Sequence, residues 1–102
     1  MRILGRNLRT PVGEVDVLAQ DGAALVVVEV KTGRRADPDT LEARIDRAQR
    51  RRLKAAVRWI EDNLRSSDPQ FGTDVEHVRC DWVLVRLEGR VPAILHVRDV
   101  FG

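Results

Sequence analysis

The chain has 102 residues, of which 43% are hydrophobic and 33% charged, and it carries a formal net charge of +2 at pH 7. This length accommodates one small hydrophobic core, so we expect a single domain over residues 1–102. The longest uninterrupted apolar run, residues 23–28, is far shorter than the ~20 residues that a membrane-spanning helix needs. A single cysteine, Cys80, excludes a disulfide framework and a thiolate zinc site. With no signal-peptide pattern at Met1, these features predict a cytoplasmic protein without a membrane partner.

Three strands are predicted in the first third of the chain. Residues 2–8 form a short strand that ends in a turn at Thr10-Pro11. Residues 13–20 alternate, which places Val15, Val17 and Ala19 on one side and Glu14, Asp16 and Leu18 on the other. Asp21-Gly22 is typical of a hairpin. The valine-rich segment 24–32 is then a strand whose two faces are both covered.

A long helix follows a connector at residues 31–39. Asp39 or Thr40 can cap its N-terminus. Its apolar positions recur at helical spacing: Leu41, Ile45, Leu53, Ala56, Val57, Ile60 and Leu64. Gln49 fills the gap in this stripe, so the helix turns an amide toward the interior. A buried polar side chain is costly unless it is hydrogen-bonded, which marks Gln49 as a candidate functional residue.

Two further strands are predicted after the helix, at residues 78–87 and 91–97. The resulting order, β-β-β-α-β-β, predicts an α/β fold with a mixed sheet and one long helix packed on a face of it. Cys80 and Trp82 fall on one side of the first of these strands, so we expect both to belong to the core. Trp59 follows the apolar edge of the helix and is also expected to pack inside.

Positive charge is concentrated in the helix. Seven of the fifteen residues 44–58 are basic and only Asp46 is acidic. Such a concentration favours a polyanionic partner, of which nucleic acid is the commonest. An ordinary solvated helix face is the alternative.

Three carboxylates and a lysine fall on one patch of the predicted hairpin. Glu14 and Asp16 lie two apart on one strand, and Glu29 and Lys31 lie two apart on the next. The register can pair Asp16 with Glu29, or Glu14 with Glu29; either keeps the four groups together. Carboxylates this close repel one another, and a hard cation such as Mg²⁺ would relieve the repulsion, with the Val30 carbonyl as an additional ligand. The alternative is a wet sheet face with cross-strand ion pairs.

The motifs around these residues resemble those of the YraN family. These are small uncharacterised bacterial proteins, similar to Holliday junction resolvases, within the PD-(D/E)XK nuclease superfamily. The resemblance rests on four segments: Ile3-Leu4-Gly5-Arg6-Asn7-Leu8-Arg9, Gly13-Glu14-Val15-Asp16-Val17-Leu18-Ala19, Val27-Val28-Glu29-Val30-Lys31-Thr32 and Ala48-Gln49-Arg50-Arg51-Arg52-Leu53. The resemblance implies a restriction-endonuclease-like fold. It also implies metal-dependent hydrolysis of DNA phosphodiester bonds, with branched DNA as a candidate substrate.

Carried over by position, the resemblance makes Asp16 and Glu29 the ligands of Mg²⁺ or Mn²⁺ and Lys31 the lysine of the superfamily. Glu14 becomes a nearby acid and Gln49 the helix glutamine that approaches the active site. Phosphate contacts are expected from Arg6, Arg9, Arg34, Arg47, Arg50, Arg51 and Lys54. Cutting two strands would suit a homodimer. The alternative function is a nucleic-acid-binding or assembly module that keeps the fold without cutting.

The sequence departs from the family pattern at two points. Family members usually begin with a further helix that carries a glutamate, and the corresponding segment is missing before Met1. We therefore expect the nuclease-like fold without its first helix. The family's Lys-Thr-Arg triplet is Lys31-Thr32-Gly33 here, which shifts the following arginine to Arg34.

Overall fold

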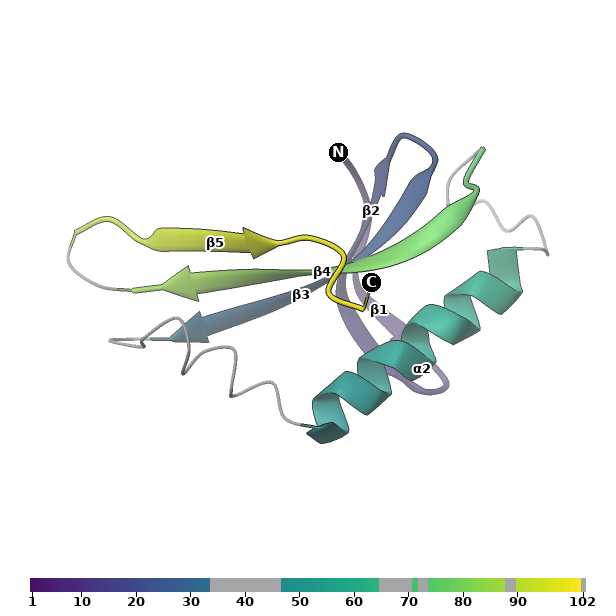
Figure 1. Cartoon of the computed structure of the whole chain (residues 1–102), viewed down its shortest axis with the longest axis horizontal. Helices are drawn as coiled ribbons and strands as arrows, with labels where there is room; N and C mark the ends of the chain where they lie inside the picture. The colour runs from purple at the N-terminus through teal and green to yellow at the C-terminus, as the bar shows by residue number, and fades with distance from the viewer. Residues whose placement is uncertain (34–46, 65–70, 72–73, 88–89, 102) are drawn as a thin grey trace.

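A computed structural model describes residues 1–33, 47–64, 71, 74–87 and 90–101 of the chain (Figure 1). The elements in chain order are β1 (Arg2–Thr10), β2 (Gly13–Asp21), β3 (Ala24–Gly33), α2 (Arg47–Leu64), β4 (His77–Arg86) and β5 (Ala93–Val97). The five strands agree with the predicted ones to within about two residues at each end, and the predicted helix is confirmed from Arg47 onward. The predicted capping residues Asp39 and Thr40, together with Leu41, Ile45 and Arg34, lie outside the described residues.

The five strands form one mixed sheet in the order β1-β2-β3-β4-β5. Only the β3–β4 pair is parallel, and the other pairs are antiparallel. The predicted hairpin is confirmed, because Asp21 pairs with Ala24 across a two-residue turn. Gly22 in that turn has a φ of 58°, a backbone conformation that glycine adopts without strain. The observed architecture is therefore an α/β fold in which α2 packs on one face of a mixed sheet.

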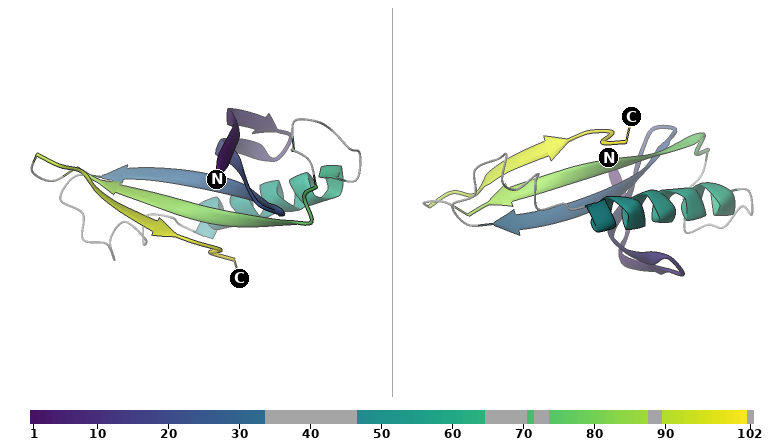
Figure 2. Two further views of the ribbon diagram at one scale, coloured as in Figure 1. Left: turned by 90° about the horizontal axis from the view of Figure 1, so that it is seen from above. Right: turned by 60° about the horizontal axis from the view of Figure 1, so that its bottom comes forward.

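The helix α2 covers one face of the sheet with its apolar stripe (Figures 1 and 2). Its buried residues Leu53, Ala56 and Ile60 lie in the core, and the last two join Leu25 and Val27 of β3 in one cluster. Trp82 and Cys80 of β4 belong to the same cluster, as predicted. Burial raises the pKa of the Cys80 thiol to about 12, with a smaller contribution from nearby carboxylates, which fits an inert core side chain. A smaller cluster of Ala19, Ala24, Val26 and Val28 lies on the other face.

Asn7 has an unusual backbone conformation within the β1–β2 hairpin. This residue falls between the pairs Arg6–Val17 and Leu8–Val15, and its φ of 52° is in the left-handed region that asparagine tolerates. Figure 2 shows the hairpin turning away from the plane of the other three strands. The strict alternation predicted for residues 13–20 is wrong at this point: Val15 and Leu18, three residues apart, both lie in the cluster under α2. Val15 therefore packs on the α2 side of the sheet, whereas Val17 packs against the cluster on the other side.

The end of the same hairpin contacts α2 through Gly13. A Cβ atom built on Gly13 would lie 2.9 Å from Cγ of Arg52, and the φ of this glycine is 148°. Only a residue without a side chain permits this approach of backbone to the arginine stem. The hairpin is thus fixed against the helix at its turn, as well as paired to the sheet at its base.

In the described part of the chain, no helix is long and apolar enough to cross a membrane.

Candidate metal and nucleic-acid site

The acidic site lies where β2 and β3 separate. Their ladder pairs Val17 with Val28, and the next pair in that register would be Asp16 with Glu29. This is the first of the two registers that the sequence left open. In place of a backbone ladder contact, the Asp16 carboxylate accepts a hydrogen bond from the Val30 amide at 2.9 Å. The β1–β2 hairpin therefore brings one carboxylate to the edge of the central strand.

Glu29 is the buried member of the pair, with an exposed fraction of 6%. Its side chain shares the α2 side of β3 with Leu25 and Val27, which explains why a carboxylate is covered there. Burial raises the pKa of Glu29 above its usual value, and the negative charge of Asp16 raises it further. Lys31 opposes both effects through an ion pair of 3.4 Å with Oε1 of Glu29. Among the described residues, Lys31 offsets these effects only in part, and the pKa of Glu29 stays above its usual value.

The donors present suit a hard divalent cation. Mg²⁺ takes one or two carboxylates and keeps several waters, and the two carboxylates of Asp16 and Glu29 supply that number. Within the described ranges, no group of three or more His, Cys, Asp or Glu side chains is arranged to hold a metal. Glu14 is exposed and pairs with Arg9 across the β1–β2 hairpin. A metal here would thus rest on two carboxylates, a backbone carbonyl such as that of Val30, and water.

The helix brings basic side chains to the same side of the sheet. Cζ of Arg50 lies 5.1 Å from the ring centroid of Trp82, and Trp82 is the β4 partner of Glu29 in the parallel register. Nζ of Lys54 lies 5.3 Å from the ring centroid of Phe101. Gln49 is partly buried one residue before Arg50. The first half of α2 therefore lies over the strand next to the acidic site, on the face that carries Glu29.

The other cations predicted to contact phosphate are spread over three places. Arg6 and Arg9 are exposed on β1, and Arg51 is exposed on α2. Arg47 is the first described residue of α2. Arg34 lies outside the described residues.

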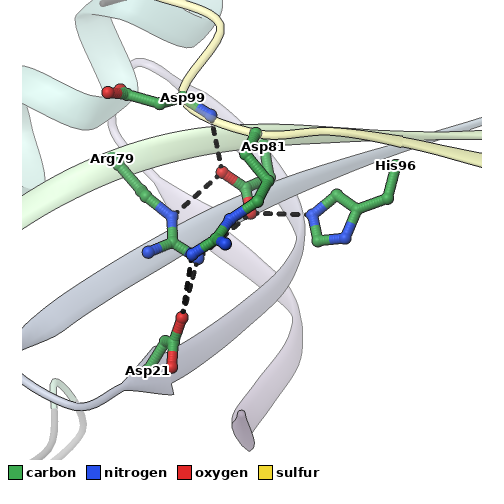
Figure 3. Close-up of polar contacts among 6 residues, drawn as sticks. Asp21, Arg79, Asp81, His96 and Asp99 are labelled. Atoms are coloured by element: carbon green, nitrogen blue, oxygen red, sulfur yellow. Dashed lines mark hydrogen bonds and ion pairs between the residues drawn. The ribbon is translucent and has the colours of Figure 1, made fainter.

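A second buried carboxylate, which the sequence analysis did not single out, lies on the opposite face of the sheet. Asp81 is fully buried and accepts hydrogen bonds from Nε of Arg79 at 3.1 Å, Nε2 of His96 at 2.8 Å and the Asp99 amide at 2.9 Å (Figure 3). Burial raises its pKa, but these donors more than offset burial and hold the pKa below its usual value. Arg79 also pairs with Asp21 at 3.0 Å. This network joins β4 to β5, to the C-terminal segment and to the β2–β3 turn.

The fold and site together describe an α/β protein with an acid pair and a lysine at the edge of a central strand, beneath a basic helix. The sequence profile of the uncharacterised protein family UPF0102 matches residues 1–85. The chain belongs to this family, which confirms the resemblance to YraN-like proteins. The resemblance to resolvase nucleases remains a prediction.

Three relatives illustrate the breadth of the match. A UPF0102 protein of Rhodococcus jostii is 37% identical over 103 residues, which span 99% of this chain and 80% of the relative. One from Rhizorhabdus wittichii is 41% identical over 85 residues, covering 83% of this chain and 64% of the relative. One from Kosmotoga olearia is 38% identical over 91 residues, covering 88% of this chain and 70% of the relative.

Proposed function

We propose that this chain is a metal-dependent endonuclease that hydrolyses phosphodiester bonds in DNA, on the restriction-endonuclease-like fold that its motifs resemble. One observation carries the proposal. Glu29 is buried beside Asp16, and Lys31 only partly compensates the charge of the pair. A buried carboxylate beside a second carboxylate lowers the stability of a sheet, and groups of this kind are concentrated at binding and catalytic sites.

Each residue of the site has a role in this proposal. Asp16 and Glu29 hold Mg²⁺ or Mn²⁺, with the Val30 carbonyl as a further ligand. When bound, such an ion acidifies a water and stabilises negative charge on a phosphate oxygen. Lys31 orients the attacking water or stabilises the charge that develops on the phosphate. Gln49, on the helix, and Glu14, at an exposed position of β2, assist Asp16, Glu29 and Lys31 in the hydrolysis.

The substrate is held by its phosphates. Exposed cations of β1 and of the first half of α2 lie on both sides of the acid pair along the chain: Arg6, Arg9, Arg50, Arg51 and Lys54. Contacts of this kind neutralise phosphates without reading sequence, so binding weakens steeply as salt is raised.

Cleavage of labelled linear, flapped and four-way-junction DNA, with Mg²⁺, Mn²⁺ or EDTA, tests the proposal. Asp16→Asn removes the charge but keeps an oxygen for the Val30 amide, so we expect a folded protein that binds DNA and does not cut it. Glu61→Gln, an exposed acid on the far half of α2, is the matched control and should cut normally. Salt-sensitive binding without metal-dependent cutting by the unaltered chain would instead favour a non-catalytic nucleic-acid-binding or assembly module.

A further inference from the structure

A groove separate from the acid pair lies between the turn of the β1–β2 hairpin and α2. Its volume is about 540 Å³, within the range of roughly 300–1,000 Å³ that small-ligand sites occupy. Val12 forms the hairpin side. The helix side is formed by Arg51, Lys54, Ala55, Arg58, Trp59 and Asp62. None of the functional roles proposed above uses Arg58, Trp59 or Asp62.

The hairpin wall of this groove is held in place. The contact of Gly13 with the Arg52 stem fixes the hairpin turn against the helix, one residue after Val12. On the other wall, Trp59 packs edge-on against the buried Phe71, with ring centroids 6.3 Å apart. Both sides of the groove therefore rest on packed structure, so the groove does not depend on surface side chains alone.

The lining combines three kinds of chemistry. Arg51 and Arg58 are seven residues apart, which places them on one side of the helix about two turns apart. Half-buried Ala55 and Trp59 line the groove beside these arginines, with exposed Val12 on the hairpin side, and form an apolar floor. Asp62, the last of the lining residues along α2, adds one carboxylate. Trp59 was expected to pack inside from the apolar edge of the helix; it packs against the core and also lines this groove.

We propose that this groove binds an unpaired nucleotide of a single-stranded nucleic-acid segment, an inference that rests on the proposed function and names the form of its substrate. Arg51, Lys54 and Arg58 contact the phosphates. The base or sugar lies on the apolar floor beside Trp59, since base–aromatic contacts tolerate any sequence. Asp62 accepts a hydrogen bond from an N–H group of the base, such as N3–H of thymine.

Charge and shape together favour a single strand over the other polyanions. A double helix is too wide to enter a groove of this volume, and it presents its bases stacked inside. An acidic peptide would satisfy the three cations, but its carboxylate side chains would offer Trp59 no planar partner and Asp62 no hydrogen-bond donor. A nucleotide uses all three kinds of lining at once.

Tryptophan fluorescence provides a direct test. The chain has two tryptophans, and Trp82 is 4% exposed, so a change on binding reports on Trp59. We expect a short oligothymidylate, added in EDTA, to quench the emission, and Trp59→Phe to abolish the quenching. Trp59→Leu should weaken binding at least about fivefold, the lower bound for one base–aromatic contact. Arg58→Ala should reduce the slope of log K against log salt by about 0.7.

The controls separate this proposal from a general effect of charge. Arg90→Ala removes the same charge from an exposed position beyond the groove and should leave binding of the oligonucleotide unchanged. Equal weakening by Arg58→Ala and Arg90→Ala would overturn the proposal. So would competition by duplex DNA as effective as by single strands. Binding of polyglutamate that survives Trp59→Leu would assign the groove to an acidic protein partner instead.

The proposal for the groove and the proposal for the acid pair can be tested independently. Asp16→Asn should retain oligothymidylate binding in EDTA, because it alters no group of the groove. Cutting that is intact in Trp59→Leu, with no loss of single-strand affinity, would overturn the groove and leave the nuclease standing. Single-strand binding at Trp59 without any metal-dependent cutting would overturn the nuclease and leave the groove proposal standing.

Discussion

The two buried carboxylates of the sheet, Glu29 and Asp81, have opposite surroundings on opposite faces. Asp81 is fully buried, receives hydrogen bonds from Arg79, His96 and the Asp99 amide, and has a pKa below its usual value. Glu29 faces a second carboxylate, has one lysine partner, and has a pKa above its usual value. Both residues are covered by the protein, so burial alone does not distinguish them. What differs, among the described residues, is how much positive charge and how many hydrogen-bond donors surround each ionised carboxylate.

This difference assigns different tasks to the two sites. A carboxylate whose lone pairs are satisfied by the chain contributes to stability and has little capacity left for a ligand. A carboxylate left undercompensated at the edge of a strand reduces stability until something positive arrives. We therefore treat Asp81 as part of the scaffold and Glu29 as part of the binding site. Substitutions at the two positions should have effects of opposite kind.

The largest expected effect is loss of stability in Asp81→Ala. Removing one partner of a buried ion pair typically costs about 3–5 kcal/mol, since the Arg79 guanidinium and the Asp99 amide lose their acceptor. The free energy of unfolding in urea measures the loss. Glu61→Ala, at an exposed acid of α2, is the control and should change it by no more than about 0.5 kcal/mol. A small loss in Asp81→Ala would remove the contrast between the two faces.

Acidification should remove the same contribution from the unaltered chain. The pKa of Asp81 is lower in the folded than in the unfolded state, so its stabilisation is complete above the unfolded value of about 3.9. It is lost as the pH falls through the folded pKa. Urea midpoints of the unaltered chain and of Asp81→Asn should therefore converge below about pH 4. Midpoints that stay equally far apart at low pH would contradict this assignment.

The sequence predicts one of these two sites far better than the other. Glu14, Asp16, Glu29 and Lys31 share a hairpin, and period-two alternation with an Asp-Gly turn is enough to bring the two strands together. The Asp81 network joins residues as distant as Asp21 and Arg79, 58 positions apart, through pairings that no local pattern specifies. Local patterns therefore predict the candidate site, whereas the scaffold that holds the sheet's other face requires the tertiary structure.

The fold shows the same division between local and distant determinants. Strand positions and the apolar stripe of α2 follow from periodicity. The left-handed φ of Asn7 does not, because one such residue leaves no periodic trace. The break in alternation that puts Val15 and Leu18 in the same cluster is not predicted by the pattern either. The contact of Gly13 with Arg52 is likewise invisible in the sequence.

Mn²⁺ or Mg²⁺ should stabilise the unaltered chain by binding at the Asp16–Glu29 pair and not at Asp81. At a concentration about 100 times the dissociation constant, a ligand of the folded state adds about 2.7 kcal/mol to the free energy of unfolding. Thermal unfolding with and without metal measures this, and EDTA should reverse it. Glu29→Gln should lose most of the shift, and Asp81→Asn should keep it despite its lower starting stability. A shift retained in Glu29→Gln would place the cation elsewhere.

Without metal, Glu29→Gln should leave the protein as stable as before or stabilise it by up to about 1 kcal/mol at neutral pH. The folded state raises the pKa of Glu29, which means that ionisation of this group opposes folding above the unfolded value of about 4.3. A neutral amide of similar shape removes that cost, and Lys31, 27% exposed, can turn to solvent. Urea unfolding in EDTA tests this. A loss as large as that of Asp81→Asn would show that Glu29 is structural.

The smallest effect should come from His96→Ala, which measures how much His96 contributes to the stability of the Asp81 network. The His96 side chain is 40% exposed, so water can replace its hydrogen bond to Asp81 once the ring is removed. Arg79 and the Asp99 amide still hold the carboxylate. We expect a loss of about 0.5 kcal/mol in urea unfolding, since a net hydrogen bond contributes about 0.5–1.5 kcal/mol when buried and less when exposed. His77→Ala, an exposed histidine at the start of β4, is the control. A loss near that of Asp81→Ala would mean that β5 is held to the sheet chiefly through His96, and the Asp81 site would then depend on the edge strand more than on Arg79.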